Sequence, residues 1–266
     1  MSVTPSSTLK HAQVPRILSA YNNRLYRQHG AYRVKIDLLD GADTSEIKVY
    51  ALANTWYVKR SIQMAKQIHD TAMEEERAMT RPARWYDFRI DDNTGVLGFD
   101  QMVLASVVSP GAAPAPATHP GEYAMSQIED TAGNNREFRV LGATSSTGWN
   151  IFTEFDQLQN TSRDPDQPVP SGAGYDGADA TLEGTNIENL QIKGDLPPYD
   201  GEDLEDRVFV QVGSLYRSGG NQRLSTGFFD APLGMVWITQ PTADGTPLLE
   251  MEVKAGNYKG VHMEAY

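Results

Sequence analysis

The sequence predicts an all-β protein, an antiparallel eight-stranded jelly-roll sandwich with one long inserted helix and long surface loops. Three observations support this fold class. Several short segments alternate apolar and polar residues, which is the pattern of half-buried strands. Glycine (23 residues) and proline (15 residues) are spread along the chain and favour many short elements joined by turns. Strand and helix patterns do not alternate, and 266 residues are enough to bury a sizeable core.

The first two strands are predicted at Ala31–Leu38 and Glu46–Leu52. In the first strand every second residue is apolar, so one face is hydrophobic and the other carries Arg33 and Lys35. Residues 39–43 between the two strands have the composition of a turn.

A single long helix is predicted next, over Tyr57–Met79. Thr55 is a suitable N-cap, apolar residues recur at three-to-four spacing, and Pro82 stops the helix. The other side of the helix is polar, so we expect it to lie on a surface or between subunits. His69 and Asp70 do not predict a catalytic pair, because adjacent positions on a helix do not face each other.

Four strands are predicted in the middle of the chain, as two pairs. Arg84–Asp91 and Gly98–Val108 flank a hairpin sequence, and Glu137–Leu141 is followed by Trp149–Phe155. Residues 109–121 contain four prolines, so we expect an extended surface loop there.

An acidic segment, Asp156–Asp206, then interrupts the strand pattern. Its thirteen Asp or Glu residues and two cations give a formal charge of −11, so we expect a loop on the outer surface or at a subunit contact. A short strand can form within it at Asn186–Lys193. The chain closes with strands at Arg207–Arg217, Gly234–Gln240 and Leu248–Lys254. The residues predicted to lie in the core are Val34, Ile36, Phe88, Ile90, Val208 and Val210.

The first 36 residues, the leader, contain no acidic side chain, although the whole chain has a formal charge of −12. Its candidate nucleic-acid-binding residues are Lys10, Arg16, Arg24, Arg27, Arg33 and Lys35. Frequent Ser, Thr, Pro and Asn predict irregular backbone, so we divide the chain into a basic N-terminal arm (residues 1–30) and a single domain (residues 31–266). Tyr21, Tyr26 and Tyr32 suit stacking on unpaired bases. The alternative is a solvated tail whose tyrosines pack on the domain.

The sequence contains no recognisable catalytic, membrane-spanning or export signal. Cysteine is absent, and the five histidines are scattered without an HxH or HExxH pair. Gly172–Gly177 matches the GxGxxG dinucleotide spacing, but it lacks the flanking strand and helix that this motif needs. No apolar run approaches the ~20 residues of a membrane span, and the start lacks the apolar core of a secretory signal. We therefore expect no enzyme activity and no organic cofactor.

Calcium is the one metal ion that the composition suggests. The weak candidate ligands in the acidic segment are Asp164, Asp166, Asp203 and Asp206. These carboxylates can hold Ca²⁺ at subunit interfaces, or they can simply face water, as acidic loops usually do.

Three segments resemble capsid proteins of small circular, Rep-encoding single-stranded DNA viruses: Thr55–Val58, Ala83–Ile90 and Val253–Met263. The resemblance implies a jelly-roll subunit of an icosahedral shell in a virion made in the host cell. It also implies a basic N-terminal arm directed to the genome, so the expected partners are other copies of the chain and single-stranded nucleic acid. Arms in that family are often longer and richer in arginine than this leader.

Two other classes of function remain open at the level of the sequence. A sandwich that binds carbohydrate or a receptor would be a monomer or trimer with an aromatic platform. An enzyme on a β-sandwich would need histidines and carboxylates clustered in one cleft.

Overall fold

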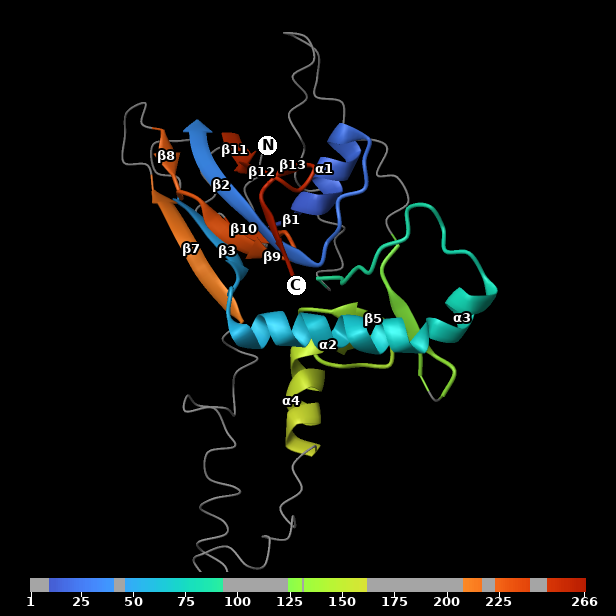
Figure 1. Ribbon diagram of the computed structural model, residues 1–266. Coiled ribbons are helices and arrows are strands. Elements are labelled where there is room, and N and C mark those ends of the chain that lie inside the picture. Colours follow the sequence, from blue (N-terminus) through green and yellow to red (C-terminus); the bar gives the residue numbers. More distant parts are fainter. Residues whose placement is uncertain are drawn as a thin grey trace, which may run out of the picture.

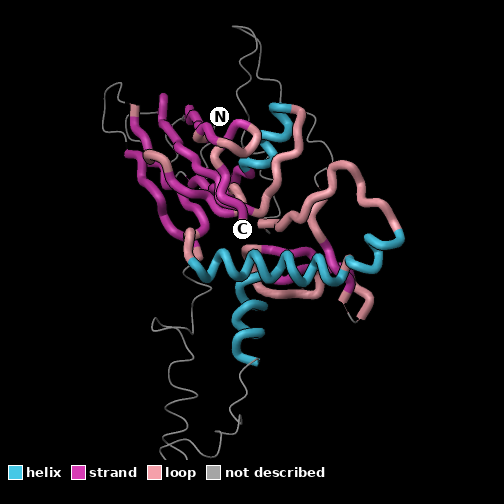
Figure 2. The backbone as a smooth tube through the Cα atoms, viewed as in Figure 1, coloured by secondary structure: helices cyan, strands magenta, loops and turns pink. Residues whose placement is uncertain are grey.

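The computed structural model describes residues 10–40, 46–92, 124–130, 132–161, 208–216, 223–239 and 248–266 (Figure 1). Over these residues the protein is mostly β-sheet, and strand neighbours in its two large sheets are antiparallel. Figure 2 shows most of the strands gathered in one half of the molecule, with the longest helix lying across their end and a small group of strands beside that helix. An all-β sandwich is therefore confirmed in its broad form.

Two large sheets make up this half of the molecule. The first has the order β1 (Lys10–Gln13), β10 (Met235–Thr239), β3 (Glu46–Leu52) and β7 (Phe209–Tyr216). The second is built around β2 (Gly30–Asp40), which pairs with β8 (Leu224–Ser225), β9 (Phe229–Pro232), β11 (Leu248–Val253) and β14 (Met263–Ala265).

The pairing of early strands with late strands is nested. Lys10 lies opposite Ile238 in the β1–β10 pair, and Tyr32 lies opposite Ala231 in the β2–β9 pair. Val49 lies opposite Gly213 in the β3–β7 pair. The chain thus folds back on itself as one long antiparallel ribbon whose successive pairs are distributed between two sheets.

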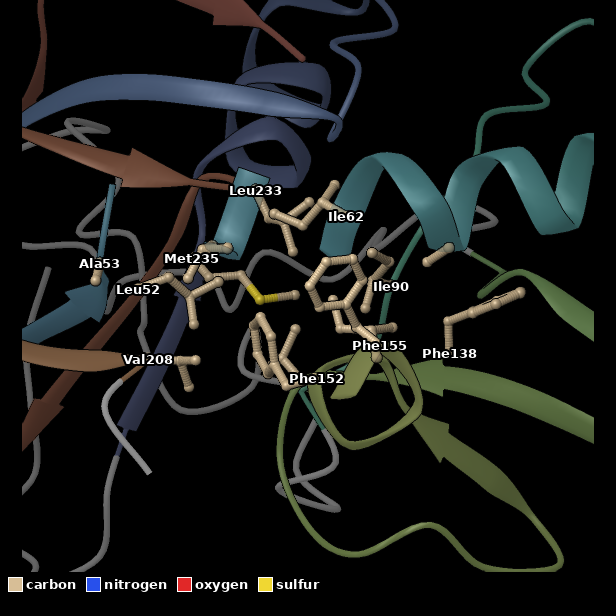
Figure 3. Close-up of a cluster of buried hydrophobic side chains, with 14 of the residues drawn as sticks. Leu52, Ala53, Ile62, Ile90, Phe138, Phe152, Phe155, Val208, Leu233 and Met235 are labelled. Carbon is tan, nitrogen blue, oxygen red and sulfur yellow. The ribbon is translucent and has the colours of Figure 1, made fainter. Parts of the chain in front are cut away.

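In the first sheet, β10 is buried on both faces. Met235, Val236, Trp237 and Ile238 are all fully buried. Val236 and Ile238 face the second sheet and pack with core residues of β2, β3 and β11. Met235 and Trp237 face the other way and belong to a second apolar cluster that also contains helical residues, in which Figure 3 labels Met235. The Trp237 ring contacts His11 and Phe209 of its own sheet. This second apolar cluster joins the sandwich to the helical side of the molecule.

The predicted helix is present as α2 (Trp56–Ala72), followed by the short α3 (Glu74–Met79). The Thr55 side chain caps α2 by accepting a hydrogen bond from the Val58 amide at 3.4 Å. Val58 and Ile62 are fully buried in the second cluster. The prediction of one uninterrupted helix to Met79 is wrong, since α2 ends at Ala72.

The strand predicted at Trp149–Phe155 is wrong. β6 (Gly148–Asn150) pairs in parallel with β5 (Asn135–Arg139), which also pairs with β4 (Gln127–Glu129). The chain then enters α4 (Ile151–Thr161), which projects from the body (Figure 1). The Asn150 side chain causes the switch, because its Oδ1 accepts the Phe152 amide at 3.0 Å as an N-cap.

The strand predicted at Arg84–Asp91 is also wrong, apart from a single bridge between Asp91 and Arg139. The Gln28 side chain takes the place of a partner strand, since its amide donates to the Ile90 carbonyl at 3.0 Å and accepts from the Ile90 amide at 2.8 Å. Phe88 and Ile90 are buried as predicted.

Three of the remaining core predictions are confirmed and one is wrong. Val34, Ile36 and Val208 are buried, whereas Val210 is 40% exposed. The register between β3 and β7 shifts between Val49 and Tyr50, and this bulge breaks the alternation along β7.

Several predictions lie outside the described residues. They are the strand at Gly98–Val108, the loop at residues 109–121, the motif Gly172–Gly177, the strand at Asn186–Lys193 and the part of the acidic segment after residue 161. Among the described helices, none is long and apolar enough to span a bilayer.

Candidate nucleic-acid interface

The leader is part of the packed domain from Lys10 onward. β1 is a strand of the first sheet, and α1 (Val14–Asn22) follows with a proline in its first turn. Ala12 and Val14 are buried in the core between the sheets. The irregular backbone predicted for the leader is therefore wrong over residues 10–22, because residues 10–13 form a strand paired with β10 and residues 14–22 form a helix.

A loop at residues 23–29 connects α1 to β2. Asn23 ends the helix in the left-handed region, with φ of 51°, and the Arg24 amide donates to the Ser19 carbonyl at 3.3 Å. Arg24 and Arg27 are exposed on this loop. The loop therefore presents two of the predicted cations to solvent.

The other four predicted cations are placed differently. Arg16 is only 6% exposed, so it is not a surface charge. Lys35 forms ion pairs with Glu252 at 2.5 Å and with Asp37 at 3.3 Å. Its hydrogen bond to Glu252 raises the pKa of the Lys35 ammonium. Arg33 is half-buried on β2, and only the backbone of Lys10 lies within the description.

The C-terminal hairpin packs against the loop. It consists of β12 (Ala255–Gly256) and β13 (Gly260–Val261), joined by a turn in which Lys259 has φ of 51°. The Tyr26 hydroxyl donates to the Lys259 carbonyl at 3.0 Å, and the Arg27 amide donates to the Tyr258 hydroxyl at 3.0 Å. The Lys259 ammonium donates to the Leu25 carbonyl and lies 5.3 Å from the centre of the Tyr258 ring. These contacts hold Arg27 and Lys259 on one surface.

The cations on this surface form no salt bridge with a carboxylate in the described part of the chain, although Arg27 is close enough to Asp87 to favour a lower pKa of its carboxyl. The absence of a salt bridge holds for Arg24, Arg27, Lys254 and Lys259. Lys254 lies just before the hairpin, where its backbone amide donates to the Arg33 carbonyl and its side chain is exposed. Seven cations elsewhere are held by carboxylates: Lys35, Lys48, Lys59, Lys66, Arg136, Arg139 and Arg223. Arg60, Arg81 and Arg84 on the helical side are exposed and form no salt bridge with a described carboxylate. We call Arg24, Arg27, Lys254 and Lys259 the cationic surface.

Of the three tyrosines predicted to stack on bases, only Tyr21 is available. Its side chain is 76% exposed at the end of α1, next to the loop. Tyr26 and Tyr32 are buried and hold the loop in place, since Tyr32 donates its hydroxyl proton to the Arg27 carbonyl. The alternative that the leader tyrosines pack on the domain thus holds for these two residues.

The end of the loop is fixed by buried polar groups. The backbone amide of Gln28 donates a hydrogen bond to Asp87 Oδ2 at 3.1 Å. Burial raises the pKa of the Asp87 carboxyl, and burial lowers the pKa of the neighbouring His29 imidazole. The loop is therefore anchored by a hydrogen bond to a buried carboxylate.

The other histidine cluster, around His69 on the helical side, lies among aromatic side chains, and the described ranges contain no metal centre. His69 Nε2 lies 2.9 Å from the Tyr86 hydroxyl and its Nδ1 lies 3.5 Å from Asp70, but the ring is packed against Phe88 and Phe138. No group of three His, Asp or Glu residues there can hold a metal ion. The calcium candidates Asp164, Asp166, Asp203 and Asp206 lie outside the described residues.

Sequence reasoning missed Lys254 and Lys259 as companions of the leader cations. The available signal was the turn Gly256–Gly260, which places a tyrosine and a lysine between two glycines. Its packing on residues 25–27 depends on contacts more than 200 residues apart in the chain, which a local pattern does not report.

No family model, curated protein or solved structure matches this chain.

Proposed function

We propose that this chain is a viral capsid protein that self-assembles into an icosahedral shell and packages single-stranded nucleic acid through its cationic surface. One observation carries the proposal. The leader loop and the C-terminal hairpin carry four exposed cations that form no salt bridge with a described carboxylate, in a chain whose net charge is −12. Cations segregated from such an acidic background favour a polyanion as the partner.

The nested strand pairing supports a jelly roll as the fold of the subunit. In a jelly roll a long antiparallel ribbon wraps so that its pairs alternate between two facing sheets. The pairs β1–β10 and β3–β7 lie in the first sheet, and the pair β2–β9 lies in the second. This arrangement agrees with the fold that the sequence resemblance implies.

Exposed apolar side chains on the helical side support self-association. Trp56 is 61% exposed, Met79 is 86% exposed and Trp85 is 53% exposed, all within or next to α2 and α3. Large aromatic residues are the typical anchors of subunit interfaces. The C-terminal residues already have partners in the subunit, since β14 pairs with β2. We therefore expect α2 and α3, rather than the C-terminus, to lie in an interface.

The test of nucleic-acid binding is the affinity of unassembled subunits for single-stranded DNA, measured over a range of salt concentrations. Four phosphate contacts at about 0.7 each give a slope of log affinity against log salt of about −3. Replacing Arg24, Arg27 and Lys259 by glutamate should weaken binding at least about tenfold and flatten this slope.

The matched control replaces Arg60, Arg81 and Arg84 by glutamate. These three cations are also exposed, but they lie on the helical side, and the net charge changes equally. Equal losses of affinity in the two triple variants would show that net charge, and not the cationic surface, governs binding.

The test of assembly is electron microscopy of the purified protein with and without single-stranded DNA. The proposal expects uniform spherical particles. A monomer or a trimer under all conditions would instead favour a carbohydrate- or receptor-binding sandwich.

A further inference from the structure

An apolar pocket of about 200 Å³ lies between α2, α4 and the β5–β6 pair. Met64 and Ile68 line it from α2, Phe138 and Trp149 from β5 and β6, and Phe155 from α4. Figure 3 shows Phe138 and Phe155 on the same side of the second apolar cluster. Three aromatic rings therefore contribute to a space that the packing of the core does not fill.

The one ionisable group among the residues lining this pocket is Glu154 in the first turn of α4. The Thr144 hydroxyl donates to Glu154 Oε1 at 2.9 Å, and the hydroxyl oxygen accepts the Asn150 amide at 3.2 Å. Since the amide fixes the direction of the single hydroxyl proton, the carboxylate is held in one position. The N-terminal end of α4 stabilises its negative charge.

Glu154 has no cationic partner within the described residues. The two arginines of β5 are occupied, since Arg136 binds Asp130 and Arg139 binds Glu137. The Arg136 guanidinium also lies over the Trp149 ring, 5.6 Å from its centre, but it does not neutralise Glu154. A half-buried carboxylate at an aromatic pocket, with one hydroxyl donor and no described cationic partner, is complementary to a positively charged ligand with an apolar body.

We propose that this pocket binds a small hydrophobic cation, with one ring or a branched aliphatic body and a single ammonium group. The size of the ligand follows from the pocket volume of about 200 Å³. Pockets for drug-sized ligands have volumes of ~300–1,000 Å³, whereas an apolar cavity of ~150 Å³ accommodates benzene. The ammonium group binds Glu154, and the body lies among Phe138, Trp149 and Phe155. This site is separate from the cationic surface and does not depend on the proposed function.

The experiment compares three probes of similar shape on the full chain: phenethylammonium, neutral 2-phenylethanol and anionic 3-phenylpropanoate. Saturation-transfer NMR and tryptophan fluorescence report binding. We expect the cation to bind at least about tenfold more tightly than the alcohol, because a charge-assisted hydrogen bond is stronger than a hydrogen bond between neutral groups. The anion should not bind.

Two variants locate the site, and thermal unfolding shows whether each is folded. Glu154→Gln keeps the shape and the Thr144 hydrogen bond, and it should reduce the preference for the cation to less than about twofold. Ile68→Trp narrows the mouth at a position that is 42% exposed, and it should abolish binding of all three probes. Glu129→Gln, on the exposed strand β4, is the matched control and should bind like the unmodified chain.

Equal binding of cation and alcohol, or unchanged binding by Glu154→Gln, overturns the proposal. So does the absence of binding by every probe. If in that case Ile68→Trp impairs self-association, the pocket receives a side chain from a neighbouring copy of the chain.

Discussion

Two segments of the cationic leader differ in what their basic side chains contact. We call residues 10–22 the first half of its described part before β2 and residues 23–29 the second half. In the first half, β1 pairs with β10 and Arg16 is buried. In the second half, Arg24 and Arg27 are exposed and form no salt bridge with a carboxylate in the described part of the chain. Cationic composition therefore indicates a charged segment, but the apolar residues between the charges decide whether it folds into the domain.

The apolar spacing explains the difference. Ala12 and Val14 alternate with residues that face the other side of the first sheet, and Ile17 and Leu18 continue the apolar face on α1. Residues 23–29 contain no comparable run, so they cross the surface and are held by hydrogen bonds to the C-terminal hairpin. Four predictions can break or sharpen this division.

The largest expected effect is on the unfolding free energy, and the test compares an alanine-to-aspartate change at two positions of the first half. Ala12→Asp places an unpaired carboxylate in the core between the sheets, where Ala12 is 1% exposed, and should cost at least about 4 kcal/mol in unfolding free energy. Ala20→Asp, on the exposed side of α1, should cost less than about 1 kcal/mol. Denaturant unfolding measures both, and similar losses would mean that β1 is not part of the core.

A smaller loss is expected where α1 meets the turn before β10. A Cβ atom at Gly234 would lie 2.4 Å from Pro15 Cδ, and the residue has φ of 62°. Gly234→Ala should therefore cost about 3 kcal/mol, of which about 1 kcal/mol comes from the left-handed backbone.

Gly227→Ala is the matched control for the backbone contribution. Gly227 has φ of 70°, and a Cβ there would have no neighbour within 4 Å. It should cost only about 1 kcal/mol in unfolding free energy. Equal costs at the two glycines would show that Pro15 does not press on the turn.

The alternating strands were predictable from the sequence, and the segments set by single side chains were not. β2 and β3 follow from period-two alternation, and Val34 and Ile36 lie in the core as expected. Residues 84–91 also alternate, but the Gln28 side chain supplies the hydrogen bonds of a missing strand. A long-range contact of this kind leaves no periodic trace in the sequence.

The candidate interface was predictable only in part for the same reason. The leader cations were visible as charges without acidic neighbours, and Arg24 and Arg27 are indeed exposed. The ion pair between Lys35 and Glu252 depends on β11, which lies more than 200 residues further along the chain, and the burial of Arg16 depends on the packing of the whole domain.

The third prediction compares two cations of the leader in nucleic-acid binding. Arg27→Ala should reduce the salt slope by about 0.7, because one phosphate contact is lost. Lys35→Ala should leave the slope unchanged, since Glu252 and Asp37 already neutralise Lys35. Single-stranded DNA titrations at several salt concentrations distinguish the two. An equal reduction by both variants would mean that the ion pairs of Lys35 open on binding.

The smallest expected effect concerns pH at His29, where the loop joins the domain. Burial lowers the pKa of His29 below the ordinary value of 6.5, an effect that Lys66 and Arg27 reinforce and that Asp87 and Asp70 oppose. As the pH falls below about 6.5, the unfolded chain takes up the proton first. The stabilisation from this site is therefore complete above that pH and is lost as the pH falls toward the lower, folded-state pKa.

His29→Gln removes this titration while keeping a polar side chain of similar size. Between about pH 7.5 and pH 5.5, the unfolding free energy of the unmodified chain should fall more steeply than that of the variant, and the difference isolates His29 from the other histidines. The loop must be packed against the domain, so that His29 is half-buried, for the difference to exist. Parallel pH profiles would show that residues 23–29 are detached from the domain in solution, and the cationic surface would then lack the fixed geometry on which its proposed role depends.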